Sequence, residues 1–115
     1  MNSYQIEYLG IWKTAFAKFL GWSEEETLLW AETLLVGMNP PGMVINEPPL
    51  YYVARELAWR QPCFDDLSQR EGFELIRGLQ NILAPNHERG FAPGFDFEQA
   101  RNQIGELARN TKPER

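Results

Sequence analysis

Hydrophobic residues recur every three or four positions along most of this chain, which is the periodicity of an α-helix. The first such segment runs from about Ser3, which can cap it, to Leu20. Its inner stripe is predicted to be Leu9, Trp12, Phe16, Phe19 and Leu20, with a second stripe of Tyr4, Tyr8, Ile11 and Ala15 beside it. Gly21 is expected to end this helix, because glycine readily adopts the left-handed conformation found at helix C-termini.

The second segment has the clearest start signal in the chain. Ser23 followed by Glu26 forms a capping box, and consecutive glutamates lie at the positive end of the helix dipole. The predicted inner face is Leu28, Ala31, Leu34, Leu35 and Met38. Trp30 falls opposite that face, so the helix has a second apolar side. That side indicates a second neighbour, which could belong to another chain. Gly37 and the prolines after it end the helix.

Three more helices are predicted further along. The third begins at Pro48 or Pro49 and stops at Pro62, because proline is tolerated only in the first helical turn. Its apolar face is Leu50, Val53, Ala54, Leu57 and Ala58, and Glu56 and Arg60 form a favourable pair one turn apart.

Another capping box, Ser68 with Glu71, opens the fourth helix, which reaches about Leu83. Its predicted inside is Phe73, Ile76, Leu79 and Leu83. Asp96 caps the fifth helix, whose face is Phe97, Ala100, Ile104, Leu107 and Ala108. In the loop between them, Phe91, Phe95 and Phe97 are expected to pin the chain onto the core.

These patterns predict an all-α fold, a compact bundle of about five helices with a Pro-rich segment between two of them. The chain has 115 residues, which suits a single domain over 1–115, with a frayed tail at 111–115. Met43, Val44 and Ile45 are the one β-leaning triplet. They are too few and too near proline to found a sheet.

Charge and composition limit the classes of binding partner that the sequence favours. The net charge is −5, and residues 1–50 carry two lysines against six glutamates. Nucleic-acid binding usually begins with a basic patch, so no nucleic-acid partner is predicted. No apolar run approaches the roughly 20 residues of a membrane helix. The sequence shows no signal peptide and has a single cysteine, so we predict a cytoplasmic protein with no membrane partner.

No catalytic, metal or cofactor motif is recognisable. His87 is the only histidine and lies in a polar loop beside Glu88, so it is interpreted as an ordinary surface residue. Cys63 is interpreted as a small, half-buried core residue. One histidine, one cysteine and scattered carboxylates do not supply the spaced ligands of a metal site. The predicted catalytic residues, metal ligands and cofactors are therefore none.

The segment 37–52 is unusual because it is rich in proline and also apolar. It holds four of the eight prolines, and an apolar, proline-stiffened connection must pack on something. Either it covers the protein's own core or it offers a surface to another molecule. We expect the second, because its prolines lower the entropic cost of holding one shape.

The leading functional hypothesis is a non-catalytic cytosolic interaction or regulatory module that binds itself as a homodimer or binds another protein. The predicted binding residues are Trp30, Met38, Met43, Ile45, Tyr51, Tyr52 and Arg55. An alternative is a protein that binds a small apolar ligand between the second and third helices, with Arg55 as a polar anchor. A third reading is a small enzyme that uses His87 with Glu88.

Overall fold

A computed structural model describes residues 3–34 and 47–114, and within these ranges the regular structure is entirely helical. The all-α prediction with five α-helices is therefore confirmed. The chain divides into two compact units, an N-terminal unit, Met1–Pro49, and a C-terminal unit, Leu50–Arg115. The single domain over 1–115 stays a prediction. The predicted end of the second helix near Gly37 and the triplet at Met43 lie outside the described residues.

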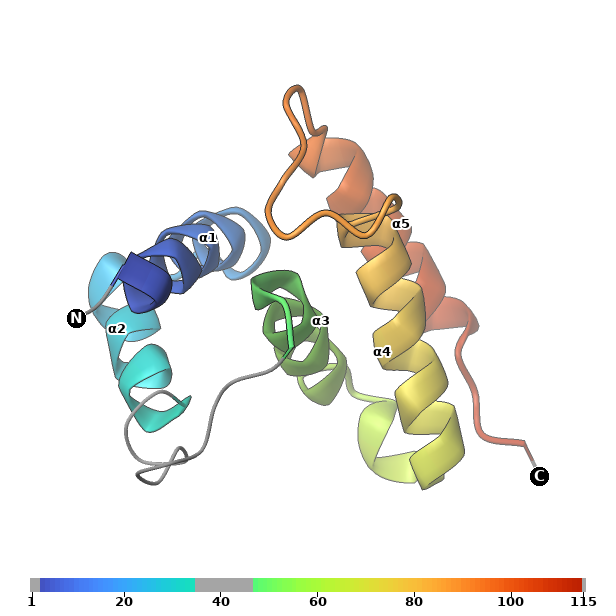
Figure 1. Ribbon diagram of the computed structural model, residues 1–115. Helices are drawn as coiled ribbons and strands as arrows, with labels where there is room; N and C mark the ends of the chain where they lie inside the picture. The colour runs from blue at the N-terminus through green and yellow to red at the C-terminus, as the bar shows by residue number, and fades with distance from the viewer. Residues whose placement is uncertain (1–2, 35–46, 115) are drawn as a thin grey trace. The chain divides into compact units, whose positions relative to one another are not determined.

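The described part of the N-terminal unit contains two packed helices, α1 (Ser3–Leu20) and α2 (Glu24–Glu32) (Figure 1). Gly21 ends α1 with φ of 69°, as its place after the apolar stripe predicts. The capping box of α2 is present. The Ser23 hydroxyl accepts the Glu26 amide at 3.2 Å, and the Glu26 carboxylate accepts the Ser23 amide at 3.3 Å.

Removing this cap has a predictable cost. Ser23→Ala is expected to lower the free energy of unfolding by about 0.5–2 kcal/mol, because an amide of the first turn loses its acceptor. Urea denaturation would measure the change. Thr14→Ala is the matched control, since the exposed Thr14 hydroxyl bonds only the Gly10 carbonyl of its own helix. An equal loss in both variants would contradict a capping role for Ser23.

An aromatic cluster forms the core of the N-terminal unit. Trp12 and Phe16 are fully buried, and the Trp30 ring stands edge-on to both, with centroids 4.8 and 4.7 Å away. Tyr8 meets Trp12 at 5.5 Å, and Trp22 meets Phe16 at 4.9 Å. The edge-to-face contacts of Trp12 with Tyr8 and Trp30 are favourable beyond the area that they bury.

The inner face of α2 therefore differs from the sequence prediction. Trp30 packs inward, and Leu28, which was predicted inside, is 39% exposed. The inward stripe instead passes through Thr27, which is 1% exposed. Its hydroxyl donates to the Ser23 carbonyl at 3.2 Å, so burying this polar side chain leaves no unmet hydrogen bond.

Two aromatic side chains of α1 donate hydrogen bonds to backbone carbonyls of residues 47 and 49, in the last part of the Pro-rich segment 37–52. The Tyr8 hydroxyl donates to the Glu47 carbonyl at 2.6 Å. The Trp12 indole N–H donates to the Pro49 carbonyl at 3.0 Å. Each buried aromatic thus meets its polar requirement, and the end of the segment is attached to α1.

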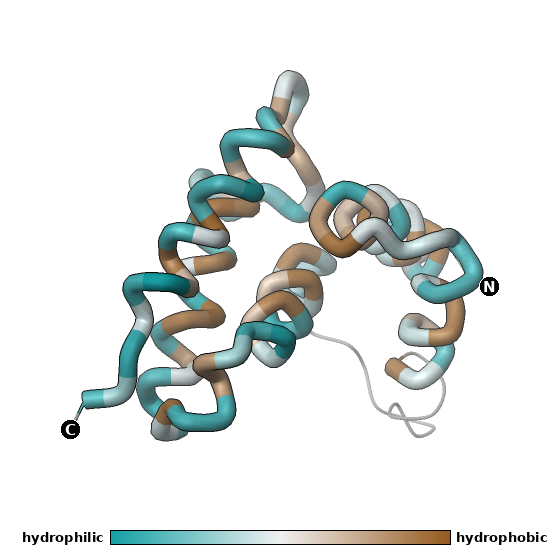
Figure 2. Tube along the Cα trace, turned by 180° about the vertical axis from the view of Figure 1, so that it is seen from behind, coloured by the Kyte–Doolittle hydropathy of each residue, from teal (hydrophilic) through white to brown (hydrophobic). Residues whose placement is uncertain are grey.

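The C-terminal unit contains α3 (Pro49–Trp59) from Leu50 onward, a short 3₁₀ turn η2 (Phe64–Asp66), α4 (Gln69–Leu83) and α5 (Phe97–Asn110). Helices α4 and α5 lie side by side and antiparallel in Figures 1 and 2. Brown, hydrophobic positions alternate with teal ones along both helices in Figure 2, as expected for helices that each bury one side.

The core stripe of α4 contains Leu75, Ile76, Leu79 and Leu83, all buried. Phe73, which was predicted inside, is 55% exposed. The stripe passes through the neighbouring Gly72 instead, where an added Cβ would lie 3.2 Å from the Phe64 ring. Because the Phe64 ring packs so closely on it, Gly72 belongs to the buried side of α4. It has no side chain, however, so it does not appear in the hydrophobic periodicity of the sequence.

The loop and tail of the C-terminal unit are tied by local contacts. Phe91, Phe95 and Phe97 pack on one another with centroids 4.8–5.0 Å apart. The Glu71 carboxylate accepts the backbone amides of Ser68 at 2.8 Å and Glu114 at 2.7 Å. These hydrogen bonds lower the pKa of Glu71. Residues 111–114 lie beyond the last helix, and fraying of 111–115 stays a prediction.

Candidate functional site

A groove lined largely by aromatic and apolar side chains lies between α3 and α4, within the C-terminal unit. It encloses about 270 Å³. We call it the α3–α4 groove, and its lining residues are Tyr51, Arg55, Trp59, Phe64, Leu67, Ser68, Gln69, Gly72, Phe73 and Ile76. Arg55 is the one residue among these ten with a full charge at neutral pH.

Helix periodicity explains how the two walls form. Tyr51, Arg55 and Trp59 follow one another at intervals of four residues along α3, so they share one side of it. The facing wall comes from Gln69, Gly72, Phe73 and Ile76, at spacings of three and four along α4. Phe64 and Leu67 come from the turn between the helices. The small size of Gly72 lets Phe64 approach α4 closely.

Two large rings of this groove are open to solvent. Trp59 is 46% exposed and Phe73 is 55% exposed. Single exposed apolar residues are normal on a protein surface, but exposed rings that line the same concavity are typical of binding sites. The groove therefore presents apolar area that a bound group would remove from water.

Arg55 is held in place by the rings around it. Its guanidinium carbon lies 4.6 Å from the Trp59 ring centroid and 5.0 Å from that of Tyr52, both within the range of cation–π attraction. Its Nε is buried and has no hydrogen-bond partner among the described residues. Leaving a buried donor without an acceptor is unfavourable by about 1–3 kcal/mol. A bound partner whose acceptor reached this Nε would remove that cost and so bind more tightly.

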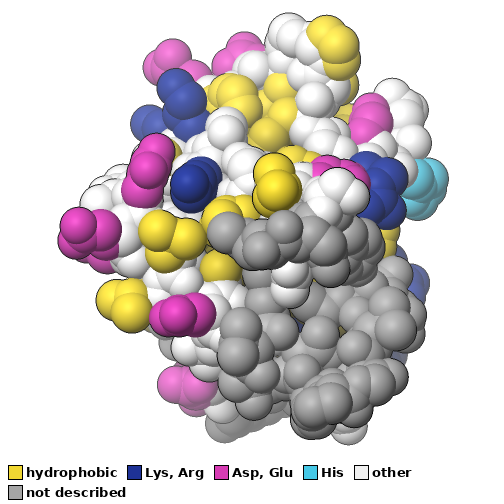
Figure 3. Space-filling view, turned by 60° about the vertical axis from the view of Figure 1, so that its left-hand side comes forward, with side chains coloured by type: hydrophobic (Ala, Val, Ile, Leu, Met, Phe, Trp, Pro, Cys, Tyr) yellow, Lys and Arg dark blue, Asp and Glu magenta, His cyan; other side chains and the backbone are white. Residues whose placement is uncertain are grey.

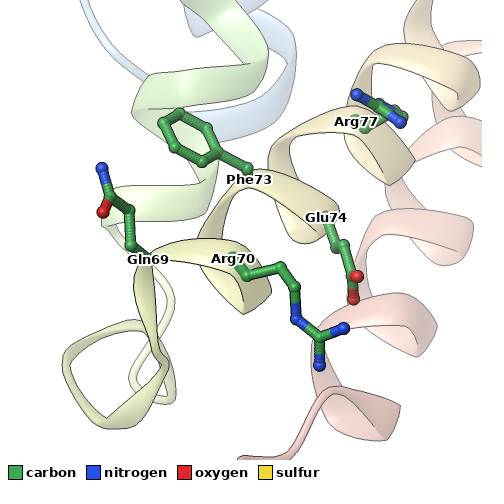
Figure 4. A pocket seen from close by; sticks show the side chains of 5 residues that line it. All are labelled: Gln69, Arg70, Phe73, Glu74 and Arg77. Carbon is green, nitrogen blue, oxygen red and sulfur yellow. The ribbon is translucent and has the colours of Figure 1, made fainter.

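A second concave surface continues from the groove along the exposed side of α4. It encloses about 400 Å³, and its lining residues are Gln69, Arg70, Phe73, Glu74 and Arg77 (Figure 4). Gln69 and Phe73 line both concavities. Figure 4 shows the Phe73 ring directed away from the Arg70 and Glu74 side chains, so Phe73 forms a ridge between the two hollows.

The structure distributes the sequence-predicted binding residues over different places. Tyr51 and Arg55 line the α3–α4 groove. Tyr52 is only 7% exposed, and it supports Arg55 from the core side. Trp30 belongs to the aromatic cluster of the N-terminal unit. Met38, Met43 and Ile45 lie outside the described residues. A binding role for each of the seven stays a prediction.

Trp59, Phe64 and Phe73 line the groove, and sequence reasoning did not select them for binding. The available signal for Trp59 was its place four residues after Arg55 on one side of a helix. Phe73 was assigned to the core, because an aromatic residue near an apolar stripe is more often buried. Phe64 comes from a turn, where no periodicity indicates which way a side chain points.

The polar loop holds His87 in a turn. His87 is exposed, has a left-handed φ of 61°, and donates its backbone amide to the Ala84 carbonyl at 3.0 Å. The Glu88 carboxylate accepts the Asn86 amide at 3.0 Å. Hydrogen bonds from its own amide and from Asn86 lower the pKa of Glu88. This carboxylate therefore binds the backbone of the turn.

Cys63 is half-buried and free, as its sequence context predicts, and its Sγ lies 3.9 Å from the Ala108 carbonyl oxygen. Over residues 3–34 and 47–114, no group of three or more His, Cys, Asp or Glu residues is arranged to hold a metal ion. None of the described helices combines the length and the hydrophobicity that crossing a bilayer would require.

Comparisons with protein-family models, curated proteins and solved structures found no match to this chain. The candidate site is thus defined by its geometry alone, as an open groove lined by aromatic rings and a single arginine.

Proposed function

We propose that this protein is a non-catalytic interaction module that binds a segment of a protein chain in the α3–α4 groove. The observation that carries the proposal is the convergence of two exposed rings, Trp59 and Phe73, on a groove containing Arg55. Trp, Tyr and Arg are the residues that most often dominate protein–protein binding energies, and Phe is also enriched at such interfaces.

The form of the groove favours a protein segment over a small molecule. Small-molecule pockets usually bury 70–90% of a drug-sized ligand and measure about 300–1,000 Å³. This groove encloses about 270 Å³ and leaves Trp59 and Phe73 about half exposed. A side chain from a partner would fill such a space, and the exposed rings would pack against the backbone on either side of it. The predicted small-ligand pocket between the second and third helices remains an alternative prediction.

The test is a selection of short random peptides against the protein immobilised at low density. We expect enriched peptides that bind the free protein in calorimetry. Phe73→Ala should weaken their binding about tenfold or more, as the loss of a central aromatic contact does. Ile6→Ala is the matched control, because Ile6 is 58% exposed but lies on α1, outside the groove.

Two results would contradict the proposal. One is that no peptide is enriched over an unrelated helical protein. The other is that the enriched peptides bind Phe73→Ala as tightly as the wild type. Circular dichroism of each variant separates lost binding from lost folding.

A further inference from the structure

The outward side of α2 has the pattern of a docking helix. Glu25, Leu28, Leu29 and Glu32 are spaced by three and four residues, so they form one stripe. All four are exposed, and Leu29 is 67% exposed. Figure 3, which views the side of the molecule carrying α1 and α2, shows hydrophobic side chains at the surface between acidic ones. Helices that bind in grooves present apolar anchors at this spacing.

The charges of α2 and of the groove surface are complementary. Helix α2 contains four glutamates and no lysine or arginine. The two adjoining hollows in the C-terminal unit are lined by three arginines, Arg55, Arg70 and Arg77, against one carboxylate, Glu74. Arg70 also pairs with Glu114 at 2.9 Å. An acidic helix that presents two leucines therefore matches a surface with two exposed rings and a net positive charge.

We propose that α2 of a second copy of this chain occupies the α3–α4 groove, so that the protein forms a homodimer through two reciprocal α2–groove contacts. This inference rests on the proposed function, because it names the partner of the same groove. Leu28 and Leu29 pack against Trp59 and Phe73, while Glu25 and Glu32 approach the arginines at the rim of the groove.

The length of α2 explains why the contact is reciprocal. Nine residues of helix span about 14 Å, and a stable interface usually buries about 800 Å² on each partner. A single helix of this length covers only part of such an area. When each copy places its α2 in the groove of the other, the same contact forms twice. The buried area is then doubled without a further binding surface.

The first experiment measures association by sedimentation equilibrium. We expect the wild-type chain to be a concentration-dependent dimer. Leu29→Asp and Phe73→Asp should each weaken association about tenfold or more, because each puts a charge into an apolar contact. Ile6→Asp makes the same kind of change at an exposed site on α1 and should leave the dimer intact.

Charge reversal tests the electrostatic part of the contact. Arg77→Glu should weaken the dimer, and the wild-type dimer should weaken as salt is raised, because the attraction at the rim is screened. Arg109→Glu is the matched control, since Arg109 is exposed on α5 and lines neither hollow. Equal effects of the two reversals would contradict the pairing of α2 with this surface.

The decisive experiment mixes Leu29→Asp with Phe73→Asp. In the mixture, the α2 of the second variant and the groove of the first are both intact, so one of the two contacts can form. We expect the mixture to give heterodimers under conditions where each variant alone is a monomer. Native mass spectrometry distinguishes these heterodimers from species that contain only Leu29→Asp or only Phe73→Asp by mass when one partner carries an isotope label.

Three outcomes would overturn the inference: a wild-type chain that stays monomeric, a dimer that survives both substitutions, or a mixture that does not recover association. A monomer whose groove still binds selected peptides would reject the homodimer and leave the proposed function standing. A dimer that forms through α2 and the groove while random peptides fail would support the homodimer and contradict the binding of other protein segments.

Discussion

Trp12→Ala is expected to lower the free energy of unfolding by about 3–5 kcal/mol, the usual cost of truncating a fully buried aromatic residue. Trp12 has no exposed surface and packs edge-on against Tyr8 and Trp30. Its indole N–H also holds the Pro49 carbonyl at 3.0 Å. The substitution removes the centre of the aromatic cluster and leaves that carbonyl without its donor. Chemical denaturation followed by circular dichroism would measure the loss.

Two further variants separate the causes of this effect. Trp12→Phe keeps a ring in the cluster but removes the hydrogen bond to Pro49, so a smaller loss is expected. Trp59→Ala makes the same substitution at a tryptophan that is 46% exposed, and it should cost about 1 kcal/mol or less. Equal losses for Trp12→Ala and Trp59→Ala would contradict the assignment of Trp12 to the core.

Leu79→Ala is expected to destabilise the C-terminal unit by about 2–5 kcal/mol. Leu79 is fully buried on the inner stripe of α4, so its removal leaves a cavity that the neighbouring helices cannot fully close. Phe73→Ala on the same helix removes a larger side chain that is 55% exposed, and we expect it to cost less. A larger loss for Phe73→Ala would mean that the inner stripe of α4 runs through Phe73 after all.

Together these core variants test the single-domain prediction. If residues 1–115 unfold as one cooperative domain, Trp12→Ala and Leu79→Ala should each shift the same single thermal transition. If the two units unfold separately, each substitution should shift only the transition of its own unit. Differential scanning calorimetry of the two variants distinguishes these results, because each buried residue lies in a different unit.

Much of the site could not be predicted from the sequence, because its two walls are distant in the chain. Tyr51 was selected because it lies in the apolar, Pro-rich segment 37–52, and Arg55 was selected as a polar anchor beside it. Their facing residue Phe73 was placed in the core, since local spacing cannot show that Gly72 occupies the inner position. Pairing α3 with the start of α4 is a non-local event, and no residue pattern within either helix records it.

The sequence by itself determined where helices begin and end in the described ranges, because those signals are local. Ser23 with Glu26 and Ser68 with Glu71 cap their helices through bonds three residues apart, and both capping boxes are present in the structure. The spacing of apolar residues likewise determined that the fold is all-α. These features follow from contacts within one or two helical turns, which the residue order specifies directly.

Only the tertiary structure decided which side of α2 is buried. Helix α2 is apolar on two sides, and its inward stripe runs through Trp30 and a buried Thr27 rather than Leu28. The free energy of burying one side of α2 instead of the other depends on the helices that pack against it. It also depends on the hydrogen bond that satisfies the buried Thr27 hydroxyl. Periodicity defines the sides of a helix, but the neighbours that pack against it decide which side faces the core.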